Sequence, residues 1–180
     1  LVDVIGELSP NSRACLLYLF AHGGTLSQLL EESADASLLA SLGTTLADIR
    51  AELVSMQGTL VRLSSGQGWS YQHPTIHDSL TIFVSRDPTL IGIYVRGADI
   101  RHILNEATLV HDPSPEGNRI SLPASLHGAL AYRITAALDE GLTFVRYLLL
   151  DLLAERSTRD FSALMLSRIP ALAGWLRSEE

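Results

Sequence analysis

Histidine and cysteine are the side chains of this 180-residue sequence best suited to catalysis or metal binding, and it contains six histidines and one cysteine. His77 and Asp78 are adjacent, so on a helix they would point about 100° apart and could not act as a catalytic pair. His102 and Glu106 are four residues apart on an expected helix and could supply two metal ligands, but a zinc site requires at least a third protein ligand. These spacings predict no metal site.

A hydrolase-like triad would need a histidine, a carboxylate and an activated serine. His111, Asp112 and His127 provide the first two side-chain types, but no GxSxG turn is present to expose a nucleophilic serine. Cys15 falls within the apolar stripe of an expected helix, where a cysteine generally behaves as a small buried hydrophobe. We therefore expect a non-enzymatic chain that holds no cofactor of its own.

The basic residues are 13 arginines without a single lysine, against 20 acidic residues, which gives a formal net charge of −7. A phosphate-binding GxxxxGK[ST] loop requires a lysine, so this chain carries no such ATPase site. The negative charge opposes a nucleic-acid partner, since phosphates favour a basic face.

The longest apolar cluster, 144–153, is interrupted by Arg146 and Asp151 and is too short for a membrane span. Together with the single cysteine, these features predict a cytoplasmic protein that does not bind a membrane.

In the first half of the chain we expect several helices followed by a β-hairpin. Pro or Thr residues mark the starts of these helices, and Gly residues mark their ends. The first helix should lie between Ser9-Pro10 and Gly23-Gly24, a short second helix at 25–32, and a third between Thr44 and Gly58. The loosely patterned residues 33–41 suggest a loop. Alternating β-type runs at 59–63 and 69–73 flank a glycine-rich turn, which predicts a hairpin. Three helices followed by a hairpin, or wing, is the order of a winged helix, which serves DNA binding or protein packing.

The second half of the chain is expected to be helical. Helix candidates cover 74–86, 88–96 and 98–109, and then 126–138, 142–156, 161–168 and 170–176. The segment 111–118 is the strongest loop signal, and we place a domain boundary there. The predicted fold is mainly α: a winged-helix-like domain at 1–85, a helical connector at 86–110, the loop at 111–118, and an α-helical bundle or arm at 119–180.

The segment Tyr71-Gln72-His73-Pro74-Thr75-Ile76-His77-Asp78-Ser79-Leu80 resembles the F-x-H-P-S-I-x-D-F-L segment of bacterial STAND-class signal-transduction NTPases. The stretch 84–90 is similar to the continuation that leads into their helical regions. In those proteins the segment ends a winged-helix domain that follows the ATPase core. The resemblance implies a regulatory region that relays nucleotide state through contacts with a neighbouring ATPase domain and other proteins, with homo-oligomers forming through the parent protein.

His73 is the nucleotide-sensing candidate that this resemblance implies. In related nucleotide-binding domains a Met-His-Asp motif at the same junction directs its histidine to the β-phosphate of ADP, so ADP or ATP would belong to the parent protein. This sequence departs from the motif, because Gln72 replaces the methionine and Pro74 the aspartate. An imidazole at a helix N-terminus can donate a hydrogen bond to an anion that the helix dipole also favours. The alternative is that His73 only closes the wing and hydrogen-bonds a nearby carbonyl.

Trp69 and Tyr71 of the expected wing are candidates for contacts with a protein partner. Aromatic residues in an alternating strand also pack against the helices of their own domain, and we favour that second interpretation.

Two further functions fit the pattern. One is a DNA-binding winged-helix transcriptional regulator with a helical dimerisation domain, although Asp48 and Glu52 outnumber Arg50 on the helix that would enter the groove. The other is a free-standing helical scaffold that self-associates through a leucine-rich face. That face would consist of Leu142, Val145, Leu149 and Leu152.

Overall fold

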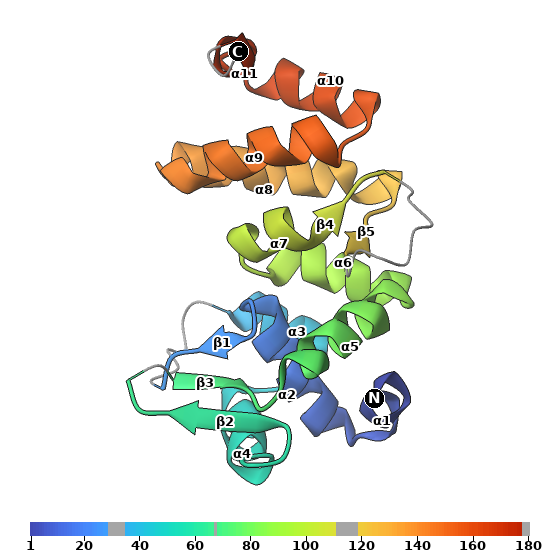
Figure 1. The fold of residues 1–180 in the computed structure, drawn as a ribbon, viewed down its shortest axis with the longest axis vertical. Helices are drawn as coiled ribbons and strands as arrows, with labels where there is room; N and C mark the ends of the chain where they lie inside the picture. The colour runs from blue at the N-terminus through green and yellow to red at the C-terminus, as the bar shows by residue number, and fades with distance from the viewer. Residues whose placement is uncertain (29–34, 67, 111–118, 178–180) are drawn as a thin grey trace. The chain divides into compact units, whose positions relative to one another are not determined.

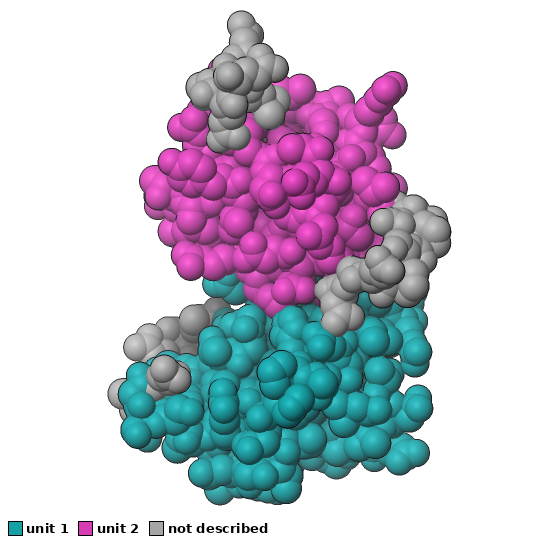
Figure 2. Space-filling model, in the orientation of Figure 1, with its two compact units in different colours: residues 1–99 teal, residues 100–180 magenta. Residues whose placement is uncertain are grey.

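The computed structural model describes residues 1–28, 35–66, 68–110 and 119–177. It is mainly helical, with a small antiparallel three-stranded sheet. The chain forms two compact units, Leu1–Asp99 (unit 1) and Ile100–Glu180 (unit 2), which are coloured separately in Figure 2. No described helix is both long enough and apolar enough to cross a membrane.

Unit 1 combines helices with the three-stranded sheet, whose strand order is β1-β3-β2 (Figure 1). Its elements are α1 (Val2–Glu7), α2 (Pro10–Ala21), β1 (Thr25–Leu26), α3 (Ala36–Leu42), α4 (Leu46–Ser55), β2 (Val61–Ser64), β3 (Gly68–Tyr71), α5 (Pro74–Ser85) and α6 (Pro88–Gly97).

Helix α2 is the centre of unit 1. The Ser9 hydroxyl accepts a hydrogen bond from the Ser12 amide at 3.1 Å, and Pro10 occupies the first turn, where its missing N–H is no loss. All eight residues from Ala14 to Ala21 are buried, so the helix is enclosed on every side rather than along one stripe. It contacts β1, α3, α4 and α5.

The expected hairpin is confirmed, and it has a third strand that the sequence did not predict. In the hairpin Val61 pairs with Tyr71 and Ser64 with Gly68, and on the other side of β3 Leu26 pairs with Trp69. The prediction of a helix beginning at Thr25 is therefore wrong. Thr25 and Leu26 form a strand there because they pair with the backbone of β3.

The segment 33–41, expected to be a loop, contains most of α3 instead. Leu38 and Leu39 are buried, and Gly43 ends the helix with φ of +67°, a conformation that glycine adopts without strain. Leu38 packs closely on Gly97 of α6, where an added Cβ would come within 2.7 Å of a Leu38 methyl group. Burial of a short apolar segment in tertiary contacts thus outweighs its weak helical pattern.

The described residues of unit 2 form helices and a two-stranded parallel sheet. Its elements are α7 (Ile100–Glu106), β4 (Ala107–Thr108), β5 (Ile120–Ser121), a 3₁₀ turn at Ala124–Leu126, α8 (His127–Asp139), α9 (Thr143–Glu155), α10 (Arg159–Arg168) and α11 (Leu172–Arg177).

The two strands of unit 2 lie on either side of the segment where we expected a domain boundary. Ala107 pairs with Ile120, and the Leu122 amide donates to the Thr108 carbonyl at 2.8 Å. Residues before and after 111–118 therefore belong to the same unit, and the units divide instead between Asp99 and Ile100, inside the expected connector 86–110. The segment 111–118 itself lies outside the described residues.

Replacing Gly68 should destabilise unit 1 far more than replacing Gly66. Both have positive φ, +83° and +79°, but a Cβ on Gly68 would lie 2.0 Å from the Leu26 carbonyl oxygen, whereas Gly66 has open space. We expect Gly66→Ala to lower the free energy of unfolding by about 1–2 kcal/mol and Gly68→Ala by at least about 3 kcal/mol. Urea titrations followed by Trp69 fluorescence, in a Trp175→Phe background, measure both. Equal losses would contradict the close β1–β3 approach.

Candidate functional site

His73 lies at the junction between β3 and α5 and is the N-cap of that 12-residue helix. Its backbone is extended, and Pro74 follows in the first helical turn. The imidazole is exposed, and its Nδ1 accepts a hydrogen bond from the Thr75 amide at 3.3 Å and lies 2.9 Å from the Thr75 hydroxyl. The Gln72 amide donates to the Leu60 carbonyl at 2.9 Å, which anchors the chain just before the junction.

The cap determines which ring nitrogen of His73 carries the proton. Because Nδ1 accepts from a backbone N–H, the neutral ring places its proton on Nε2. The exposed ring therefore offers an Nε2–H donor beside the positive end of the α5 dipole. The alternative role raised from the sequence was a hydrogen bond from His73 to a nearby carbonyl. The local bond in the structure is instead accepted from the Thr75 amide, and it is compatible with this donor.

Trp69 and Tyr71 are each only 8% exposed. The Tyr71 hydroxyl donates to the Leu16 carbonyl of α2 at 3.3 Å, and burial raises the pKa of Tyr71 well above its usual value. Side chains so enclosed offer little surface to a partner, and their positions agree with the interpretation that they pack within their own domain.

The other histidines and acids singled out from the sequence lie on α5, α7 and α8 or fall outside the described residues. His77 packs with Phe20 and Tyr71, its ring centroid lying 5.2 and 6.1 Å from theirs. In unit 2, His127 packs edge-on against Phe161 at 5.4 Å. The remaining ones include His102 and Glu106, which lie on α7, and His111 and Asp112, which fall outside the described residues.

Cys15 is completely buried in α2, as its place in the apolar stripe predicted. Burial, with a smaller contribution from Glu52, raises the pKa of its thiol to about 12. The thiol is therefore neutral near neutral pH, and a neutral buried thiol is neither a good nucleophile nor a metal ligand.

A polar cluster in unit 1 joins three residues that sequence reasoning missed. The Asp35 carboxylate accepts from the Tyr18 hydroxyl at 2.6 Å and lies 3.2 Å from Nε2 of His22. Burial and this carboxylate raise the pKa of Tyr18. The four-residue spacing of Tyr18 and His22 was visible in the sequence, but their link to Asp35 depends on tertiary structure. The cluster ties the end of α2 to the start of α3.

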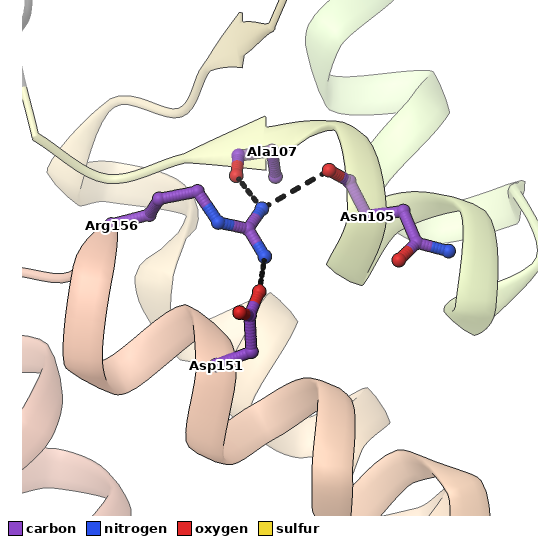
Figure 3. Close-up of polar contacts among 4 residues, drawn as sticks. All are labelled: Asn105, Ala107, Asp151 and Arg156. Carbon is purple, nitrogen blue, oxygen red and sulfur yellow. Dashed lines mark hydrogen bonds and ion pairs between the residues drawn. The ribbon is translucent and has the colours of Figure 1, made fainter.

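Arg156, at the end of α9, is the most deeply buried charged side chain among the described residues, at 4% exposure. One guanidinium nitrogen donates to the carbonyls of Asn105 at 3.1 Å and Ala107 at 2.8 Å, and the other pairs with the Asp151 carboxylate at 2.5 Å (Figure 3). The Arg156 carbonyl accepts from the Leu109 amide at 2.8 Å. Arg156 thus joins the end of α9 to the end of α7 and to β4.

Comparisons with known proteins found no match to this chain among family models, curated proteins or solved structures.

Truncating Arg156 should destabilise unit 2. Arg156→Met retains most of the apolar stem but leaves the buried Ala107 carbonyl and the partly buried Asn105 carbonyl without their donor, and we expect a loss of about 2–4 kcal/mol in the free energy of unfolding. The matched Asp151→Asn variant keeps a side-chain oxygen acceptor for Arg156 and leaves both carbonyl bonds in place, so it should lose less stability than Arg156→Met even though the Arg156 charge is no longer balanced. Denaturant titrations followed by Trp175 fluorescence, in a Trp69→Phe background, make the comparison. A loss for Arg156→Met no larger than that for Asp151→Asn would show that the carbonyl bonds contribute little.

Proposed function

We propose that this chain is a non-catalytic regulatory region of a STAND-like ATPase, with a winged-helix unit followed by a helical arm. It would couple the nucleotide state of a neighbouring ATPase domain to a sensor or effector through protein contacts. The observation that carries the proposal is the placement of His73, an exposed imidazole at the N-terminus of α5 directly after β3. That is the strand-to-helix junction at which the resembling family holds its ADP-contacting histidine.

The order of elements in unit 1 supports the winged-helix part of the proposal. Helices α2, α3 and α4 precede the β2–β3 hairpin, and β1 lies between α2 and α3 and pairs with β3. This order gives the hairpin the position of a wing, and α5 leaves it at the junction that His73 caps.

The chemistry of the junction supports nucleotide sensing rather than hydrolysis. With Nδ1 engaged by Thr75, His73 has one donor, Nε2–H, to offer to a phosphate oxygen, and the dipole of α5 favours the same anion. No lysine is present in the chain to reach the β and γ phosphates. In this proposal the neighbouring domain hydrolyses ATP, and His73 at the β3–α5 junction helps to retain ADP.

The acidic residues of α4 favour protein packing over DNA binding in this unit. Asp48 forms a capping box with Thr45, accepting from its backbone amide at 3.2 Å, and Glu52 accepts from the Ser12 hydroxyl of α2 at 2.7 Å. Both carboxylates therefore take part in the fold, at a position where phosphate contact would call for basic side chains.

Removing the imidazole of His73 should speed ADP release from the full-length polypeptide that contains this chain. His73→Asn keeps a side-chain acceptor for the Thr75 amide, whereas His73→Ala also loses the cap, worth about 1 kcal/mol. We expect both variants to release ADP about tenfold faster, since each loses a hydrogen bond to a charged group. Stopped-flow displacement of a fluorescent ADP analogue measures the rate.

The control is Gln72→Ala, which changes the exposed neighbouring side chain and leaves the Gln72 backbone bond to Leu60 in place. It should release ADP at the wild-type rate. If His73→Asn also released ADP at the wild-type rate while remaining folded, the sensing role of His73 would be refuted. Faster release by His73→Ala alone would assign the effect to loss of the cap.

A further inference from the structure

A cavity of about 490 Å³ lies within unit 2, between the α8–α9 turn and the α10–α11 turn. That volume is in the range of small-molecule sites. Its wall is mainly apolar, with contributions from Leu138, Leu142, Ile169 and Pro170. The turn at one end is fixed, because Gly141 ends α8 with φ of +80° and the Leu142 amide closes the helix on the Ala137 carbonyl at 3.1 Å.

The cavity also contains two arginines, Arg146 of α9 and Arg168 of α10, against one acid, Asp139. The lining therefore has a formal charge of +1, in a chain whose net charge is −7. Among the described residues, Nε of Arg146 is buried without a hydrogen-bond partner. A buried donor in this state is costly, and an anion bound at the terminal nitrogens of the same guanidinium would offset that cost electrostatically.

The Arg146 guanidinium is held by a stacking contact. Its central carbon lies 4.8 Å from the centroid of the Trp175 ring, which also lines the cavity. A guanidinium held over an aromatic ring can still donate from its two terminal nitrogens, and their fork matches the two oxygens of a carboxylate.

The N-terminus of α9 reinforces the preference for an anion. The helix begins at Thr143 without a side-chain cap, since Leu142 at the N-cap position has no acceptor. Leu142 and Thr143 both line the cavity, so the positive end of a 13-residue helix lies at its wall, one turn from Arg146.

We propose that this cavity binds a small aromatic carboxylate. Arg146 forms the bidentate contact, Arg168 and the α9 terminus add positive charge, and the apolar wall receives the ring. Tyr147 lies at the cavity and is 66% exposed, which offers a face for ring stacking. A formal charge of +1 matches a monoanion better than a phosphate monoester, which carries close to two negative charges at neutral pH.

Isothermal titration calorimetry of the 180-residue chain with 2-naphthoate tests the proposal, and 2-naphthamide serves as the uncharged ligand of the same shape. We expect saturable one-to-one binding of 2-naphthoate with Kd below about 1 mM, and binding of 2-naphthamide weaker by at least about tenfold. Arg146→Met and Arg168→Met should each weaken 2-naphthoate binding, Arg146→Met by about tenfold or more. Arg159→Met, which removes the same charge from an exposed position of α10 outside the cavity, should leave it unchanged.

Absence of saturable binding, or equal affinity for the acid and the amide, would overturn the proposal. Undiminished binding by a folded Arg146→Met variant would also overturn it. If circular dichroism shows that Arg146→Met does not fold, Arg168→Met, at an exposed residue, replaces it. Weaker 2-naphthoate binding by this variant would then support the proposal, and unchanged binding would overturn it. The test uses no nucleotide, so its result is independent of the regulatory role proposed for His73.

Discussion

Complete enclosure of α2 is the constraint on which unit 1 depends. A helix with eight successive buried residues must be covered on all sides, and here β1, α3, α4 and α5 supply the cover. Tyr71 is the last residue of β3, and its hydroxyl donates to the backbone carbonyl of Leu16 in α2. Helix α2 therefore also fixes the position of the junction between β3 and α5. The packing around α2 therefore also positions the exposed His73, which follows β3 at the start of α5.

Unit 2 relies instead on a buried polar contact. Arg156 donates hydrogen bonds to the carbonyls of Asn105, at the end of α7, and Ala107, in the short strand β4. The Asp151 carboxylate balances its charge. Nothing in the local sequence distinguishes Arg156 from an ordinary solvent-facing arginine at the C-terminal end of a helix. Its role depends on the approach of α7 to α9, and the sequence pattern does not specify that approach.

Local signals therefore predicted some elements well and missed those that depend on distant partners. Ser9-Pro10 and the glycine pair after Ala21 define α2, and alternation around a glycine-rich turn defines the hairpin. The strand at Thr25 exists only through its pairing with β3, and α3 through burial of Leu38 against α6. For the site, the sequence placed His73 at a strand-to-helix junction, but neither its Nδ1 cap nor the cavity between the turns of unit 2 follows from spacing along the chain.

Sequencing the coding region upstream of Leu1 is the decisive measurement for the proposed regulatory role. A STAND-like ATPase would encode, within a few hundred residues before Leu1, a GxxxxGK[ST] loop followed by a strand that ends in acidic residues. Finding that loop would supply the phosphate-binding lysine that this chain lacks and make His73 a contact to be tested against bound ADP. An initiator methionine directly before Leu1, with no such loop, would contradict the role.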